Sequence, residues 1–318
     1  MRKGPTSMSD ILPQLPAMRE ATKARPLTRV QRRIMEHRPE EDDLVFQHSV
    51  FCQTGLPYRD PGDGVRLWER RQGAASIRIL AGEVADPKEQ RFVEVGLPWG
   101  PKPRLVVAHI NAEALRQGSN VIEIEDSLSA FVKRIRGFTG GREIRMFKEQ
   151  LSRLSASLIR IAFFREDRAS QMDTKIITAC ELWLHKDERQ RVLWPSTIAL
   201  SLDYYESLQV HAVPLCESDL AALAHSAMAL DLYAWLAQRL QRIDPAKPQF
   251  ISWAAVKEQF GADYKRMNKF KEVFRVALRQ VLARYQNARL DADEGGLMLR
   301  NSPPPVRRPA VLLPRSRA

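Results

Sequence analysis

Two parts of the chain show the same order of predicted helices and strands, and this repetition constrains the fold more than any other feature of the sequence. Residues 104–157 are predicted to contain a helix, a strand and two further helices, followed by a β-hairpin in which the alternating apolar runs at 158–164 and 175–185 pair with each other. Residues 219–300 are predicted to contain a long helix, a short helix, an amphipathic helix and a hairpin. Helices that end in a hairpin in this order are typical of a winged helix-turn-helix. The sequence therefore predicts an α+β fold with tandem winged-helix domains.

The last helix of the first unit, residues 142–157, is amphipathic. When residues are placed at about 100° each, one sector collects the apolar side chains Ile144, Phe147, Leu151 and Leu154. Basic side chains gather on the remaining surface, where they are free to meet phosphate. Because the last helix of a winged unit enters the major groove, we predict DNA contacts from Arg142, Arg145, Lys148 and Arg153.

The corresponding helix of the second unit spans residues 264–285. Its apolar side holds Met267, Phe270, Phe274, Ala277, Leu278, Val281 and Tyr285. Its opposite side holds Lys265, Asn268, Lys269, Glu272, Arg275 and Arg279. A charged face that meets only solvent usually mixes signs through pairs four residues apart, whereas all of these residues except Glu272 are basic or amide. We therefore predict DNA contacts from Lys265, Asn268, Lys269, Arg275 and Arg279.

One further element is predicted before that helix and one after it. A single long helix is expected at 219–242, where Ser218 supplies the N-cap and Asp244 with Pro245 stops the helix. Residues 288–300 read as a hairpin with an acidic loop at its tip, and this hairpin would be the second wing.

The charge balance supports a nucleic-acid partner. The chain has 50 Lys+Arg against 38 Asp+Glu and a formal net charge of +12, so its surface attracts polyanions. A basic but otherwise ordinary enzyme is the alternative that charge alone leaves open. Both ends of the chain are basic and rich in proline, which predicts flexible basic termini.

These patterns divide the chain into a flexible basic arm (1–43), a β-containing segment with the first winged-helix domain (44–208), the second winged-helix DNA-binding domain (209–302) and a disordered basic tail (303–318). The cysteines Cys52, Cys180 and Cys216 are odd in number and fit neither a disulfide framework nor a zinc signature. With no signal peptide and no membrane-length apolar stretch, we expect a cytoplasmic protein without a membrane partner, metal or other cofactor.

Several ordered stretches resemble the plasmid-encoded replication initiators of the RepA family. The most characteristic is Gly96–Leu105, which continues into Ala108–Asn111; the others are Val121–Ser127, Phe147–Leu154 and Ala229–Ala237. The similarity covers roughly residues 44–300 and leaves both ends outside it.

The resemblance implies an initiator with tandem winged-helix domains that binds repeated sites in the double-stranded DNA of a plasmid origin. It also implies that the protein helps to open the duplex, recruits host replication proteins such as the initiator and the helicase, and represses its own gene. The sequence leaves both a monomer and a homodimer open.

The sequence favours a protein that is not an enzyme. The segment Gly137–Arg142 lacks the spacing and the lysine of a nucleotide-binding P-loop. Tyr204 and Tyr205 raise the alternative of a nickase or relaxase, but the six histidines are too far apart in sequence to form a recognisable metal motif. A pure transcriptional repressor is the other alternative, because it would share the same DNA-binding chemistry.

Overall fold

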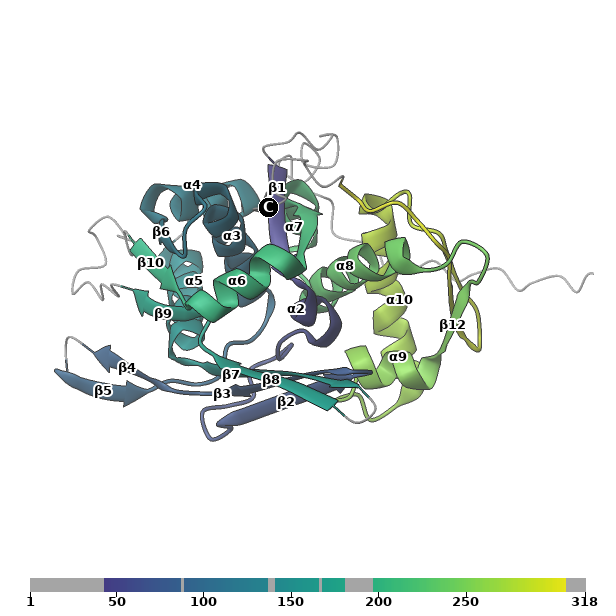
Figure 1. Ribbon diagram of the computed structural model, residues 1–318. Helices are drawn as coiled ribbons and strands as arrows, with labels where there is room; N and C mark the ends of the chain where they lie inside the picture. Colours follow the sequence, from purple (N-terminus) through teal and green to yellow (C-terminus); the bar gives the residue numbers. More distant parts are fainter. Residues whose placement is uncertain (1–42, 87–88, 137–140, 166–167, 181–196, 307–318) are drawn as a thin grey trace, which may run out of the picture.

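The structure, a computed structural model, describes residues 43–86, 89–136, 141–165, 168–180 and 197–306. Residues 1–42 of the expected arm (1–43) and residues 307–318 of the expected tail (303–318) lie outside the described residues. The start of that tail, residues 303–306, is described, and Val306 is buried. The fold mixes helices with short antiparallel sheets (Figure 1). In the described part of the chain, no helix is both long and apolar enough to cross a membrane.

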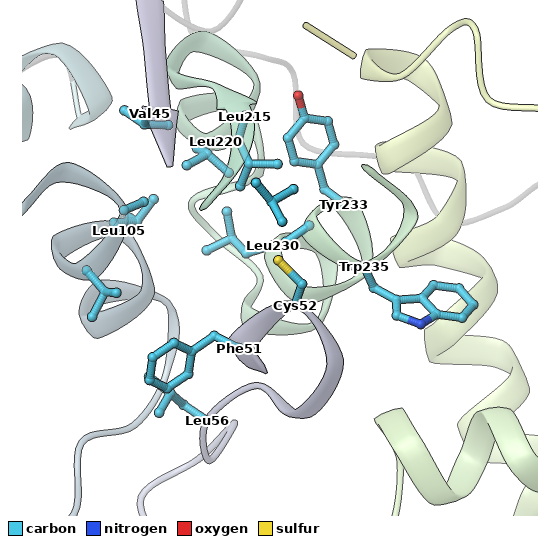
Figure 2. Close-up of a cluster of buried hydrophobic side chains, with 14 of the residues drawn as sticks. Val45, Phe51, Cys52, Leu56, Leu105, Leu215, Leu220, Leu230, Tyr233 and Trp235 are labelled. Carbon is cyan, nitrogen blue, oxygen red and sulfur yellow. The ribbon is translucent and has the colours of Figure 1, made fainter. Parts of the chain in front are cut away.

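One hydrophobic core runs through the middle of the molecule. Here α3 (Pro101–Gln117) contacts α8 (Ala227–Arg239), and α2 (Ser49–Thr54) packs against α8. Beside them β1 (Leu44–His48) pairs antiparallel with β11 (Ala212–Cys216). Figure 2 shows side chains from all five elements meeting in one cluster, which therefore joins segments on both sides of the expected domain boundary at residue 209.

The first half contains the predicted helices, but the strands that follow them pair differently from the prediction. After α3 come β6 (Val121–Glu123), α4 (Glu125–Arg136) and α5 (Gly141–Ala156), and a three-stranded sheet in the order β6-β10-β9 is completed by β9 (Ile177–Cys180) and β10 (Thr197–Leu200). The sequence paired the run at 158–164 with the run at 175–185, and this pairing is wrong. β9, which lies in the second run, pairs with β10 instead.

The run at 158–164 belongs to another sheet. β7 (Leu158–Arg165) forms a hairpin with β8 (Arg168–Thr174) and pairs on its other edge with β3 (Ala75–Leu80), which pairs with β2 (Leu67–Gln72). In the sequence, the β7–β8 hairpin of this four-stranded sheet is inserted between α5 and β9, whereas β2 and β3 precede α3. Ile77, Ile79, Ile159 and Ile161 alternate toward the core, so the alternation predicted the strand correctly but not its long-range partner.

A separate hairpin consists of β4 (Glu83–Asp86) and β5 (Arg91–Glu94). Its base is held by Arg66, whose guanidinium donates to the carbonyl oxygens of Val95 (2.9 Å), Ala81 (3.1 Å) and Gly82 (3.1 Å). The hairpin projects from one end of the molecule (Figure 1).

The second half repeats the element order of the first. After α8 and a short 3-10 turn, η2 (Leu240–Arg242), come β12 (Gln249–Ser252), α9 (Trp253–Phe260), α10 (Met267–Arg284), β13 (Leu290–Ala292) and β14 (Gly296–Leu299). The strand order β12-β14-β13 matches β6-β10-β9, since in each sheet the last strand lies in the middle. The predicted hairpin at 288–300 is confirmed, whereas β12 was not expected from the sequence.

The expected long helix at 219–242 is wrong, because the chain forms two helices there. α7 (Glu217–Leu223) ends near Ala224, and α8 starts after Ser226, whose side chain accepts a hydrogen bond from the backbone N–H of Ala229. Apolar residues continue across this break, so periodicity alone does not reveal it. Before α7, the helix α6 (Leu202–His211) is capped by Ser201 and leads directly into β11.

Candidate nucleic-acid interface

Tight packing at its start fixes the position of α10. Phe270 and Phe274 are fully buried and contact the rings of Trp253 and Phe260. The turn before the helix includes Gly261, where an added Cβ would lie only 2.2 Å from Phe270 Cδ2. Only glycine therefore lets this turn approach the aromatic cluster so closely.

Polar contacts fix the other end of α10. Arg284 Nε donates to Asp219 Oδ1 at 2.7 Å, and the Tyr233 hydroxyl donates to Asp219 Oδ2 at 2.7 Å. Tyr285, just beyond the helix, donates its hydroxyl proton to the carbonyl oxygen of Pro303 at 2.7 Å. The helix is thus attached to α7, α8 and the segment that follows β14, so its outer face has a defined orientation.

The outer face of α10 carries four of the five residues predicted to contact DNA in the second unit; Lys265 lies in the turn before the helix, because α10 begins at Met267 and not at residue 264 as predicted. Lys265, Asn268, Lys269, Arg275 and Arg279 are all exposed. The Lys269 ammonium forms an exposed ion pair with Glu272 at 2.9 Å, which is a weak interaction in water. The Arg275 guanidinium lies 5.5 Å from the centroid of Trp253, so this side chain is partly ordered before any ligand binds. Arg266, also exposed, adds a cation that the sequence prediction omitted.

The hairpin beside α10 is less suited to phosphate than a wing is expected to be. Its tip includes the exposed residues Asp293 and Glu294, while Asp291 on β13 forms an exposed ion pair with Arg300. The Asp293 carboxylate accepts hydrogen bonds from the backbone N–H groups of Gly295 (2.7 Å) and Gly296 (2.8 Å), and Lys271 Nζ donates to the Glu294 carbonyl oxygen at 3.1 Å. The tip is therefore ordered and attached to α10, while its carboxylates would repel a nearby phosphate.

The residues predicted on α5 fall into two groups. Arg142 and Arg145 are exposed, whereas Lys148 is half-buried and burial lowers the pKa of its ammonium group. Arg153 is largely buried: its guanidinium donates to the Leu97 carbonyl oxygen at 3.2 Å and forms ion pairs with three carboxylates, those of Glu149, Asp60 and Asp63. The loop that supplies two of those carboxylates is distant in sequence, and helical periodicity gives no sign of it.

The stretches that carry the family resemblance pack against one another inside the protein. Arg104 of α3 forms a two-point ion pair with Asp231 of α8, at 2.6 and 2.8 Å. The Arg104 guanidinium also donates to the carbonyl oxygens of Leu56, Pro57 and Gly100. Gln150 of α5 accepts a hydrogen bond from the backbone N–H of Trp99 at 2.8 Å. These residues hold the framework that positions α5 and α10, and they are not placed to contact a ligand.

The tyrosines considered as nucleophiles lie inside the protein. Tyr204 is fully buried, its hydroxyl donates to Asn111 Oδ1 at 3.0 Å, and burial raises the pKa of the phenol. Tyr205 is also buried. Among the residues that the structure describes, no three His, Cys, Asp or Glu side chains are grouped so that they could hold a metal ion.

Comparison with known proteins gives a family match and two structural similarities. A family model described as "Plasmid encoded RepA protein" matches residues 97–255. The fold is similar to a crystal structure of domains 2 and 3 of RctB, with a TM-score of 0.50, 8% sequence identity, and coverage of 77% of this chain and 95% of that chain. A second RctB structure of domains 2-3 gives a TM-score of 0.47 and 9% identity, and covers 79% of this chain and 94% of that one. No curated protein matches the sequence significantly.

Proposed function

The chain belongs to the family of plasmid-encoded RepA proteins, and from this premise we propose that it initiates plasmid replication by binding specific sites in duplex DNA at an origin. After binding, it would recruit host replication proteins such as the initiator and the helicase. Binding at an origin that overlaps its own promoter would also repress its gene. DNA binding is the step common to all of these activities, so the surface that binds DNA is the first part to test.

The observation that most supports this proposal is the exposed basic face of α10. We propose that α8, β12, α9, α10, β13 and β14 form a winged helix and that the first half, from α3 to β10, forms another. In a winged helix the third helix enters the major groove, and α10 is the third helix of its unit. Its cations and the amide of Asn268 can donate to phosphates and to base edges.

We propose α5 as the equivalent helix of the first unit. Arg142 and Arg145 are exposed at its N-terminal end, and Lys148 lies about one turn further along. Arg153 is left out of the proposed surface because its guanidinium is occupied by carboxylates within the chain. In Figure 1, α5 and α10 lie toward opposite ends of the molecule, on either side of α3 and α8. Such a placement would let α5 and α10 contact two sites along one duplex.

We propose that the protein carries out no covalent step on DNA. A tyrosine nucleophile must reach the phosphodiester, and the fully buried Tyr204 cannot do so without rearrangement of the core. A nickase would therefore need another nucleophile. Incubation of supercoiled origin plasmid with Mg²⁺ or Mn²⁺ tests this point, since nicked product would contradict the proposal. Loss of that product in Tyr204→Phe/Tyr205→Phe would identify these tyrosines as the nucleophile, and its persistence would indicate another residue.

Footprinting on the replicon that encodes the protein tests the proposed function directly. Protection of repeated sites beside an AT-rich segment would support initiation, whereas a single protected site at a promoter would support a pure repressor. Protection of no site would contradict both.

The variant Arg279→Ala tests the role of α10 in that binding. We expect a loss of about 1 to 3 kcal/mol on a protected site and relaxed preference at one base position. Arg59→Ala, at an exposed arginine in the loop after α2 and outside the proposed surface, is the control for loss of an arginine. Equal affinity of wild type and Arg279→Ala for every duplex would show that α10 does not bind DNA.

A further inference from the structure

Two residues in the middle of the exposed face of α10 differ in chemistry from the cations around them. Glu272 carries a carboxylate whose side chain is 66% exposed, and Val276 exposes 43% of its surface. They are four residues apart and so lie one above the other on the helix. At about 100° per residue, both lie opposite the buried side of the helix, which includes Phe274 and Val281.

Neither residue suits a helix that only holds phosphates. A carboxylate weakens attraction to the DNA backbone, and an exposed isopropyl group donates no hydrogen bond to phosphate. At the same spacing per residue, Lys269 and Arg275 lie at the two sides of this face, while Arg279 lies in its middle beside Glu272. Lys269 and Arg275 can therefore reach the backbone on either side while the middle of the face meets the floor of the groove. The floor of the major groove presents amino groups and methyl groups that match a carboxylate and a valine.

Resting on the proposed function, we propose that Glu272 and Val276 determine which bases α10 prefers. Glu272 accepts a hydrogen bond from the N4 amino group of a cytosine, and Val276 packs against the 5-methyl group of a thymine. Four helical residues rise about 6 Å, and base pairs stack about 3.4 Å apart. The cytosine and the thymine therefore lie within about two base-pair steps of each other.

Selection from a library of random-sequence duplexes tests this assignment with the full-length chain. Wild type is compared with Glu272→Gln and with Val276→Ala. In the glutamine variant the preference at one position shifts from cytosine to adenine, because an amide matches the donor and acceptor of adenine. In the alanine variant a different position, within about two base pairs of the first, loses its preference for thymine. The preference falls about fourfold for each methyl group of Val276 that no longer packs against the DNA.

Helix α6 offers matched controls. Glu206 and Val210 have the same four-residue spacing on an exposed helix face outside the proposed surface, and Val210 is 67% exposed. Glu206→Gln and Val210→Ala remove the same chemical groups, so they are expected to select the wild-type motif.

A second measurement uses unchanged protein. Deoxyuridine replaces each thymidine of the selected duplex in turn, which removes only the 5-methyl group. At the assigned position the affinity of wild type falls about fourfold, and Val276→Ala shows no further loss. If the wild-type motif persists in both α10 variants, or if no thymine methyl affects binding, the assignment is wrong while the proposed function stands. If wild type selects no motif at all, the proposed function fails with it.

Discussion

At the scale of single residues, one buried ion pair links the two halves of the chain. Arg104 and Asp231 are both buried and face each other from the two halves of the chain. A buried charge is tolerated only while its partner and its hydrogen bonds are in place. The pair therefore makes the position of α8 depend on α3, and with it the position of α10, which packs on α8.

Removal of one partner of this pair should be strongly destabilising. Asp231→Ala leaves the Arg104 guanidinium buried without its carboxylate, and we expect the free energy of unfolding to fall by about 3 to 5 kcal/mol. Urea unfolding followed by circular dichroism measures the change. The exposed Asp263→Ala serves as the control and should stay within about 0.5 kcal/mol of wild type. A loss below about 1 kcal/mol in Asp231→Ala would show that the pair is dispensable.

Two buried histidines should make the fold sensitive to mild acid. His48 Nδ1 accepts a hydrogen bond from the Val50 backbone N–H at 3.2 Å, which caps α2 and requires an unprotonated nitrogen. Burial, with a smaller contribution from the charge of His211, lowers the pKa of His48 from 6.5 to about 3. Burial likewise lowers the pKa of His109 to about 3. Between pH 6.5 and 3 the unfolded state therefore binds more protons than the folded state.

Because the unfolded state binds more protons in that window, stability falls as the pH drops below about 6.5, by up to about 1.4 kcal/mol per pH unit for each histidine. Unfolding free energies at pH 7.5, 6.5 and 5.5 avoid most of the titration of the carboxylates. His48→Gln should show a smaller loss between pH 6.5 and 5.5 than wild type does. Equal losses in the two proteins would mean that His48 is not the group that titrates.

At the scale of elements, the hairpin of β13 and β14 would be the wing of the proposed winged helix, and the exposed carboxylates at its tip give it the charge of a surface that avoids phosphate. The tip is ordered by Asp293 and attached to α10 through Lys271. A wing in this position lies near the DNA backbone when the third helix occupies the groove. Carboxylates there would limit non-specific binding and leave discrimination to α10.

Reversal of one charge at the tip tests this placement. Glu294→Lys should raise the affinity for cognate and scrambled duplexes alike and should steepen the log-log salt dependence by about one unit, the effect of one additional phosphate contact. Binding is measured at several salt concentrations. Glu206→Lys on α6 carries the same charge change away from the proposed surface and should have a smaller effect. If the two variants behave identically, the hairpin does not approach DNA.

Local patterns predicted the elements better than their partners. The apolar stripe of α10 identified Phe270, Phe274, Ala277, Leu278 and Val281, and all of them are buried. Periodicity gave no sign of contacts between segments that are distant in sequence: β7 pairs with β3, and Arg153 is covered by a loop more than eighty residues earlier. It also did not reveal that Ser226 caps a new helix inside an apolar run. β12 was missed because four residues are too few to show a pattern.

At the scale of the whole molecule, the two halves are more closely joined than the sequence indicates. β1 pairs with β11, Arg104 pairs with Asp231, and Figure 2 shows Val45, Phe51 and Leu105 in one cluster with Leu215 and Leu230. The domain boundary at residue 209 that the sequence predicts implies that each domain can fold alone, and this remains a prediction. The shared core gives a reason to expect that the second unit would lose stability when it is isolated, even though its own aromatic cluster remains intact.

Unfolding of the full chain and of a fragment that spans residues 213–306 decides between these views. The full chain should unfold in one cooperative transition, because β1 and β11 cannot separate without exposing the core that both halves share. The fragment keeps α8, α9, α10 and the strands β12 to β14, so it should show helical circular dichroism and a cooperative transition at a lower urea concentration. The Asp231→Ala substitution should destabilise the full chain much more than the fragment, since the fragment has no Arg104. Two separate transitions in the full chain, one of them matching that of the fragment, would instead show two independent modules. The orientation of α10, and with it any DNA binding by α10, would then not depend on the packing of the first half.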